Sequence, residues 1–188
     1  MQNNDDKITL CANVINDGGV VICPTEGIYG FSASIDNDNA ILRIIDIKKR
    51  DEKKGLIVVA SSFEMLDGLI DTDKLSNNII NTIKASWPGH HTWILPCTDK
   101  VSPILTGGRK SIAVRVSAFD TLKKLCDKVG SPIVSTSANI SGCNPINTID
   151  ALHKSFGLDV DYILDMPCGG ALKASTIHDA LTNTILRA

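Results

Sequence analysis

The feature of this sequence that most limits its fold is the alternation of short apolar runs with longer segments of helical spacing. The runs at 20–23 and 56–60 have the length and composition of buried β-strands. Between them, residues 40–47 place apolar side chains along one side of a helix. Strand-like and helix-like segments alternate in this way along the whole chain, without a long linker or an internal repeat. This alternation predicts one mixed α/β domain over residues 1–188.

The same patterns predict where the individual elements lie. Ser76 and Thr148 stand at expected helix N-caps, and Gly130 stands where a helix is expected to end. The expected helices cover 8–15, 40–47, 76–85, 122–129 and 148–156. The expected strands cover 20–23, 56–60, 112–116, 132–134, 162–164 and 184–186.

The composition narrows the class of protein. A formal net charge of −2 gives no overall attraction for nucleic acid, so a polyanion site would have to be a local basic patch. The six cysteines form no CxxC pair, and the N-terminal residues lack the pattern of a secretory signal. No apolar run is long enough to span a bilayer. These features predict a reduced, cytoplasmic protein.

Several common site motifs are absent from the sequence. There is no GxxxxGK[ST] loop, no GxGxxG and no GxSxG. His90 and His91 are adjacent and would point to opposite sides of an extended chain, and His153 and His178 have no companions at ligand spacing. The sequence therefore predicts no metal site.

The first candidate site is a basic cluster of Lys48, Lys49 and Arg50, followed by Lys54. Cations grouped in this way suit a triphosphate, arginine as a planar fork and lysine as a point charge. Lys48 and Arg50 are two residues apart, so they could meet one ligand only if the helix ends near Ile47 and the next loop curls back. The alternative is a solvated helix C-terminus, where cations interact with the helix dipole. The spacing leaves both interpretations open.

The second candidate is the polar stretch STSANISG at 135–142, which directly follows an expected strand. Its four hydroxyls and one amide offer neutral donors and acceptors that could surround phosphates or a carboxylate. Serine, threonine and asparagine also bond their own backbone in turns, so a plain polar turn remains the alternative.

The third candidate is the loop formed by Pro24, Thr25, Glu26 and Gly27, together with Tyr29 and Gly30, after a buried strand. A loop of this kind can bring backbone N–H groups against a ligand, although an ordinary turn fits the composition equally well. Arg115 adds a separate signal, because the period of two places it opposite the apolar side chains of 112–116. It either reaches into a cleft or lies on an exposed face of the sheet, and the sequence leaves both open.

Six segments also match one known protein family in the same order along the chain. They are VVICPTEGIYGFSA, IKKRDEKKGLIVVA, WPGHHTWILP, SIAVRVSAFD, IVSTSANISG and STIHDALTNTILR. Together they resemble the YrdC/TsaC family of threonylcarbamoyl-adenylate synthases. The similarity runs from about residue 18 to the C-terminus, and the length fits the short, single-domain bacterial form. Each motif alone is weakly specific, whereas six in this order are strongly specific.

The resemblance implies roles for the candidate residues. The family's Lys-x-Arg, its following lysine and its Ser-x-Asn fall on the basic cluster and the polar stretch. The implied catalytic residues, which act on the triphosphate, are Lys48, Arg50 and Lys54. The implied ATP- and substrate-binding residues are Thr25, Arg115, Ser135, Ser137 and Asn139. Among these, Arg115 and Thr25 would orient threonine and its carbamate.

The chain departs from the family pattern in two places. Asp51 stands where proline usually follows the signature arginine, and it adds a negative charge beside the basic cluster. Before Thr92 the family usually reads Pro-Gly-Pro, whereas this chain has Pro88, Gly89, His90 and His91, which alters the shape of that loop.

The resemblance also implies a fold and an activity. We expect an open, twisted, mixed α/β sheet flanked by helices, with a concave, positively charged cleft. The expected enzyme is a nucleotidyltransferase that joins L-threonine and bicarbonate as a carbamate, adenylates it with ATP and releases pyrophosphate. Mg²⁺ would travel with the phosphates, because no carboxylate cluster suggests a dedicated cage. Downstream transferase proteins would carry the threonylcarbamoyl group to the adenosine beside the anticodon of tRNA; a weak contact with tRNA itself is left open, and no membrane is involved.

The main alternative is an RNA-binding module in ribosome or tRNA maturation that has no catalysis of its own. The same cleft would then hold a phosphate backbone. The net charge and the aromatic content of 4% argue against it, since single-strand binders stack bases on aromatic side chains. A carbamoyl-transferring relative is a third reading, for which extra domains would be expected.

Overall fold

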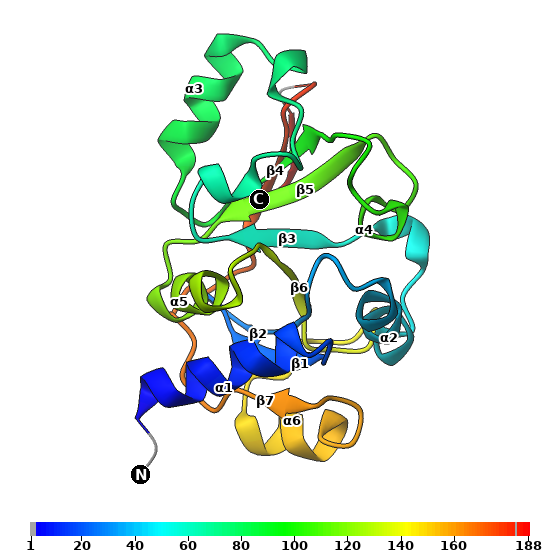
Figure 1. The fold of residues 1–188 in the computed structure, drawn as a ribbon, viewed down its shortest axis with the longest axis vertical. Coiled ribbons are helices and arrows are strands. Elements are labelled where there is room, and N and C mark those ends of the chain that lie inside the picture. The colour runs from blue at the N-terminus through cyan, green and yellow to red at the C-terminus, as the bar shows by residue number, and fades with distance from the viewer. Residues whose placement is uncertain (1–2, 183) are drawn as a thin grey trace.

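The computed structural model describes residues 3–182 and 184–188, and its centre is a large mixed sheet (Figure 1). Within the described residues the strand order is β7-β1-β2-β6-β3-β5-β4-β8-β9. The strands are β1 (Val21–Pro24), β2 (Tyr29–Ser32), β3 (Ile57–Ala60), β4 (His91–Pro96), β5 (Ser111–Val116), β6 (Ile133–Ser137), β7 (Tyr162–Ile163), β8 (Thr176–Asp179) and β9 (Thr184–Arg187). The pairs β1–β7, β3–β5 and β4–β8 are parallel, and the other neighbours are antiparallel.

Helices flank this sheet on both faces. They are α1 (Asn4–Asn16), α2 (Asp38–Lys48), α3 (Asn77–Ser86), α4 (Pro103–Thr106), α5 (Asp120–Val129) and α6 (Ile149–Phe156). The predicted N-caps are confirmed, because Ser76 and Thr148 accept hydrogen bonds from backbone amides of the first turns of α3 and α6. Gly130 ends α5 in the left-handed conformation, as predicted. The expected mixed α/β architecture with an open sheet is therefore confirmed.

Three strands lie where the sequence analysis predicts none. β2 falls in the segment interpreted as a loop after Pro24, and β4 and β8 lie in segments without a predicted element. β2 contains a glycine and a serine, and β8 is only half-buried along its length, so neither carries the apolar run of a buried strand. Both segments are strands because they pair with neighbouring strands, and their own composition would not predict it.

Two apolar clusters occupy the two faces of the sheet. On one face, α1 and α5 pack against side chains of β1, β3 and β6, including Val59 and Ile133. On the other face, α2 and α6 contribute to a larger cluster that contains Phe31, Val58 and Val114. Because neighbouring residues of a strand point to opposite faces, Val58 and Val59 belong to different clusters.

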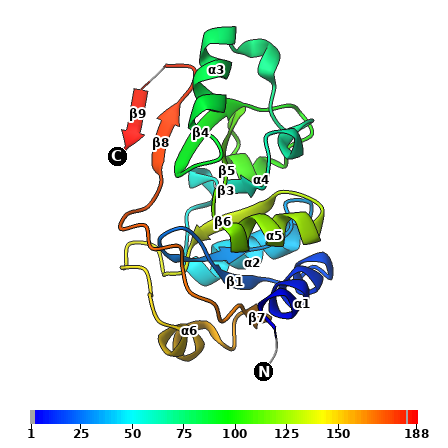
Figure 2. The ribbon, with the colours of Figure 1, turned by 90° about the vertical axis from the view of Figure 1, so that its left-hand side faces the viewer.

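The C-terminal part of the chain joins the two ends of the molecule. After β7, the segment 164–175 runs along one side of the protein to the hairpin of β8 and β9 (Figure 2). Its backbone is held to the loop after β1, because Gly169 donates to the carbonyl of Thr25 and Ala171 donates to that of Glu26. Among the described residues, no helix combines the length and apolar character needed to cross a bilayer.

The packing of α2 yields a first prediction. Ile44 is fully buried between this helix and the sheet. Ile44→Ala should lower the free energy of unfolding by about 2–5 kcal/mol, because it removes apolar contacts and leaves a cavity. Urea denaturation of this variant and of Leu10→Ala, whose side chain is half-exposed on α1, measures the difference. Equal losses in the two variants would contradict the described packing.

Candidate functional site

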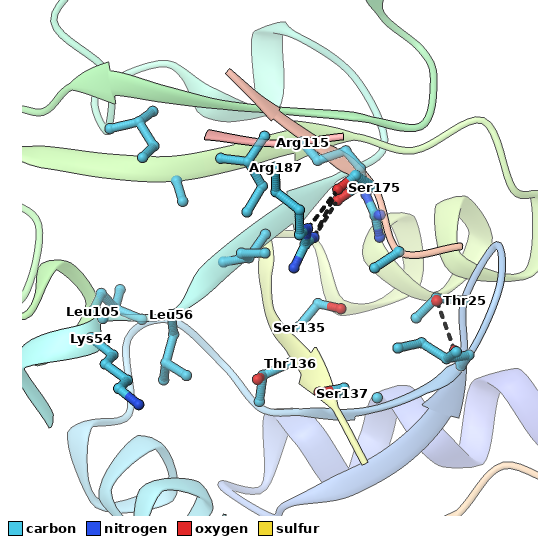
Figure 3. Close-up of a pocket in the computed structure, with 18 of the residues that line it drawn as sticks. Thr25, Lys54, Leu56, Leu105, Arg115, Ser135, Thr136, Ser137, Ser175 and Arg187 are labelled. Atoms are coloured by element: carbon cyan, nitrogen blue, oxygen red, sulfur yellow. Dashed lines mark hydrogen bonds between the residues drawn. The ribbon is translucent and has the colours of Figure 1, made fainter. Parts of the chain in front are cut away.

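A pocket of about 430 Å³ opens over part of the sheet (Figure 3). Its floor is a row of four side chains that are register partners on adjacent strands, Ser135, Ile57, Ala113 and Ile94. Ile57 lies two residues before Val59 and shares its face of the sheet, which α1 and α5 cover further along. The pocket is therefore the part of this face that the helices leave open.

The pocket is rich in cations from different parts of the chain. The lining Lys and Arg residues are Arg50, Lys54, Arg109, Arg115, Lys173 and Arg187. Within the described residues, no aspartate or glutamate belongs to the lining. A site with this charge favours anionic ligands such as phosphates and carboxylates.

The loop after α2 brings Arg50 and Lys54 to the pocket. Lys49 adopts the left-handed conformation with φ of 49°, which ends the helix and turns the chain back. The Arg50 guanidinium then donates to the carbonyl of Gly55 at 3.2 and 2.9 Å. Arg109 braces the same loop, because it donates to the carbonyls of Lys53 and Lys54 at 2.6 and 3.0 Å. Burial lowers the pKa of Arg50, and the nearby charge of Arg109 lowers it further.

Lys48 points away from this loop into the protein and does not line the pocket. Its Nζ donates to the carbonyl of Ser137, and to the carbonyl and Oδ1 of Asn139 at 3.0 and 3.2 Å. The side chain is 2% exposed and lies over the ring of Phe31. Burial, aided by the charge of Arg50, lowers the pKa of Lys48 to about 8. The loop does curl back, yet only one of the two signature cations faces the pocket, because Lys48 still belongs to the helix.

The polar stretch at 135–142 begins inside β6, which extends to Ser137, and it contains both a ligand-facing part and a turn. Ser135, Thr136 and Ser137 line the pocket. Asn139 does not; its Oδ1 accepts from the hydroxyl of Ser137 at 2.6 Å, and its Nδ2 donates to the carbonyl of Cys143 at 2.6 Å. One part of the stretch therefore faces the pocket while the amide of Asn139 organises the turn behind it.

Thr25 lies at the opposite end of the pocket from Lys54 (Figure 3). Its hydroxyl donates to the carbonyl of Ile28 at 2.7 Å, which closes the loop between β1 and β2. Gly27 allows a close approach of the C-terminal segment, because a Cβ there would lie 2.7 Å from the carbonyl oxygen of Ala171. The loop between β1 and β2 is thus both a tight turn and one wall of the pocket.

Arg115 reaches into the pocket, which settles the two placements that the sequence left open. Its side chain is 7% exposed, and its Nη2 lies 3.0 Å from Oε2 of Glu26. Burial lowers the pKa of Arg115, and the charge of Glu26 partly opposes this. Beside it, Arg187 donates through Nε and Nη2 to the carbonyl of Ser175 at 3.0 and 2.8 Å (Figure 3).

Several pocket residues have no role in the sequence analysis. They are His90, Arg109, Lys173, Ser175 and Arg187. Two of them, Ser175 and Arg187, lie in the final matching motif, STIHDALTNTILR, and this match is the sequence signal that could have identified them as site residues. The others lie in loops, and only the fold brings them to the pocket.

Two of the histidines meet although they are far apart in the sequence. Nδ1 of His91 lies 3.0 Å from Nε2 of His178, and the ring of His178 stacks on Trp93. This contact joins β4 to the neighbouring strand β8. Among the described residues, no group of three or more His, Cys, Asp or Glu side chains could hold a metal ion.

The fold and the site together define an α/β protein with a pocket lined by lysine and arginine side chains. The profile of the Sua5/YciO/YrdC family, described as telomere recombination, matches residues 13–188. Threonylcarbamoyl-AMP synthase of Aliivibrio fischeri is 41% identical over 181 residues, which are 96% of this chain and 98% of that protein. The enzyme of the same name from Vibrio parahaemolyticus is 40% identical over 97% of this chain and 98% of its own. The chain therefore belongs to the Sua5/YciO/YrdC family.

Solved structures agree with this assignment. Sua5 of P. abyssi complexed with L-threonine superposes with a TM-score of 0.87 at 31% identity, over 95% of this chain. The chain spans about half the length of that protein, 52%. E. coli YciO superposes with a TM-score of 0.82 over 97% of this chain and 89% of its own, and at 24% identity it supports the fold alone.

The buried ammonium of Lys48 yields a prediction about pH. Its pKa of about 8 lies below the ordinary 10.5, so between these two values the unfolded chain binds more protons than the folded one. The free energy of unfolding should therefore rise with pH in the wild type relative to Lys48→Met. Urea denaturation of both proteins between about pH 8 and 10 measures this difference. A difference that does not change with pH would contradict the buried position of Lys48.

Proposed function

We propose that this protein is a threonylcarbamoyl-AMP synthase, which converts ATP, L-threonine and bicarbonate to threonylcarbamoyl-AMP and pyrophosphate. The observation that carries the proposal is the identity of about 40% to proteins of that name, over nearly the whole of both chains. The relative complexed with L-threonine supports an amino-acid substrate. No observation of similar weight favours an RNA-binding module without catalysis.

The distribution of charge in the pocket suits these substrates. Arg50, Lys54 and Arg109 come from two loops that are hydrogen bonded to each other, and they form one cationic end. Arg115 and Arg187 lie at a distance from Lys54, beside Ser175 (Figure 3). We assign the triphosphate to the first end, where Arg50 and Lys54 contact it. We assign the carboxylate and carbamate of threonine to the second end.

Neutral groups complete the nucleotide site in this proposal. Ser135 and Ser137 line the pocket, where the hydroxyl of Ser135 donates to a phosphate oxygen. The hydroxyl of Ser137 gives its hydrogen to Asn139, so its oxygen accepts from a donor of the nucleotide. Asn139 fixes the Ser137 hydroxyl at 2.6 Å, and Lys48 holds the backbone of both residues. Lys48 and Asn139 therefore support the nucleotide site through Ser137.

The second end orients the amino acid. Arg115 acts as a fork for the threonine carboxylate, because a guanidinium can form two parallel hydrogen bonds with a carboxylate. Thr25 faces the same end, and its loop closes the pocket against the C-terminal segment. Together they direct the carbamate toward the nucleotide.

The reaction is a nucleotidyl transfer whose main difficulty is electrostatic. The amine of threonine combines with bicarbonate to give a carbamate and water, and a carbamate oxygen then attacks the α-phosphorus of ATP. The bond to pyrophosphate breaks as the new P–O bond forms. Both partners are anions, so the pocket accelerates the reaction mainly by holding them together and by offsetting the charge of the transition state.

Mg²⁺ accompanies ATP in this proposal and is not held by a protein cage. The lining within the described residues contains hydroxyls and cations but no carboxylate. These residues fit an ion that is coordinated by phosphate oxygens and water. When bound, the ion neutralises charge on the phosphates.

The product would serve tRNA modification in the cytoplasm. Threonylcarbamoyl-AMP is a mixed anhydride, and separate transferase proteins would move its threonylcarbamoyl group to N6 of an adenosine in tRNA. Direct contact of this protein with tRNA is not required by the proposed chemistry.

Pyrophosphate release from ATP tests the proposed function. Purified protein should release pyrophosphate only when L-threonine and bicarbonate are both present. Release without threonine would indicate a simple ATP pyrophosphohydrolase. No release with every substrate present would overturn the proposal.

Removing a cation from the triphosphate end should slow the reaction strongly. Arg50→Ala should lower kcat/KM about a hundredfold or more, because it removes a fixed positive charge from the transition state. The same assay with Lys154→Ala, an exposed cation on α6 away from the pocket, provides the control. A rate for Arg50→Ala within about threefold of the control would exclude the assigned role.

Changing the carboxylate fork should affect one substrate selectively. Arg115→Lys keeps the positive charge but cannot form the bidentate pair, so the KM for L-threonine should rise about tenfold or more. The KM for ATP should change much less. Steady-state kinetics with each substrate varied in turn measure both constants, and an unchanged threonine dependence would contradict the assignment.

A further inference from the structure

Glu26 is buried beside the pocket without belonging to its lining. Its neighbours Thr25 and Gly27 both line the pocket, whereas the side chain of Glu26 is 11% exposed and lies against Arg115. The carboxylate therefore does not face the ligand. A buried carboxylate requires compensation, and here the compensation comes from Arg115 and Ser117.

The two oxygens of this carboxylate have different partners. Oε1 accepts a hydrogen bond from the hydroxyl of Ser117 at 2.7 Å. Oε2 lies 3.0 Å from Nη2 of Arg115, although the two groups are not aligned as a hydrogen bond. Attraction between opposite charges therefore dominates that contact. In a buried environment such an attraction is weakly screened.

Ser117 holds the carboxylate in a single orientation. Its hydroxyl is fully buried just after β5 and accepts from the backbone amide of Phe119 at 3.1 Å. Because an ionised carboxylate can only accept, the hydroxyl hydrogen is directed to Glu26. Arg115 and Ser117 are two residues apart on the same strand and its extension, so both reach Glu26 from one side.

The backbone of Glu26 is fixed as well. Its carbonyl accepts from the amide of Ala171 at 2.7 Å. Gly169 packs directly against it, and a Cβ at that position would lie 3.1 Å from the Glu26 carbonyl oxygen. The position of the carboxylate is thus determined by β5 and by the C-terminal segment together.

Arg115 keeps unused hydrogen-bonding capacity in this arrangement. Its Nε is buried and has no hydrogen-bond partner within 3–182 and 184–188. The guanidinium offers five N–H donors, and Glu26 faces it at Nη2. We propose that Glu26 is a positioning residue, which holds the guanidinium of Arg115 in the orientation that receives the carboxylate of the amino-acid substrate. This inference rests on the proposed function and extends it to a residue that does not touch the substrate.

The charge of Glu26 is the property that the experiment changes. Glu26→Gln keeps the size of the side chain and an oxygen for Ser117, but it removes the attraction to Arg115. The KM for L-threonine should rise about tenfold or more, since a buried charge that loses its partner no longer has a preferred position. The KM for ATP should stay within about twofold. Glu64→Gln, an exposed glutamate outside the pocket, is the matched control and should leave both constants unchanged.

A double-mutant cycle separates positioning from a merely structural role. If Glu26 acts through Arg115, Glu26→Gln should raise the KM for threonine much less in an Arg115→Lys background than in the wild type. A purely structural role would give the same factor in both backgrounds. Glu26→Asp, which keeps the charge on a shorter side chain, should restore part of the threonine affinity.

Direct binding keeps the two proposals distinguishable. Calorimetric titration with L-threonine requires no turnover and applies to each variant. Equal threonine affinity in Glu26→Gln and wild type would overturn the positioning role alone. A wild type that neither binds threonine nor releases pyrophosphate would overturn the proposed function and this role with it.

A second variant covers the case in which Glu26→Gln does not fold. Ser117→Ala removes the hydrogen bond to Oε1 and leaves both charges in place. It should raise the KM for threonine about two- to fivefold, because the carboxylate loses one of its two fixed contacts. A Ser117→Ala protein with unchanged threonine KM would also contradict the role of Glu26.

Discussion

The two-residue period of the central strands determines both the core and the pocket. On one face of the sheet, α1 and α5 cover Val59 and Ile133, and two residues away Ile57 and Ser135 form the pocket floor. The core and the site are therefore two parts of one surface. A shift of register by one residue would turn the floor into the opposite core, so the apolar packing also fixes the site.

Two buried cations, Lys48 and Arg115, hold the walls of the pocket to the core of the protein in different ways. Lys48 is compensated by neutral oxygens of Ser137 and Asn139, and it fixes the turn behind the polar wall. Arg115 is compensated by the charge of Glu26 and still faces the pocket. Removing a buried charge's partner is costly, whereas an apolar replacement of the whole pair often is not. Both arrangements therefore favour a role in placing ligand-binding groups over a role in stability.

The sequence predicted those features that depend on local chemistry. The caps at Ser76 and Thr148 and the alternation around Arg115 needed only neighbouring residues, and the ordered motifs indicated the family. Lys48 continues the buried face of α2, four residues after Ile44, so its inward position follows from helical spacing. The left-handed Lys49, which turns the chain so that Arg50 reaches the pocket, has no comparable local signal. Arg187 lies on β9, which reaches the pocket because it pairs with β8 and β8 pairs with β4. β8 is too polar to be predicted as a strand from its own sequence. Contacts between distant segments thus account for most of the missed site residues.

In the proposed reaction, one pocket joins three substrates into an adenylate. Incubation of the protein with ATP, L-threonine and ¹³C-labelled bicarbonate, followed by mass spectrometry of the nucleotides, tests it most directly. The expected product is a threonylcarbamoyl-AMP species that carries the label in its carbamate carbon and is absent when threonine is omitted. Recovery of ATP unchanged, or of AMP with no labelled adduct at early times, would contradict it.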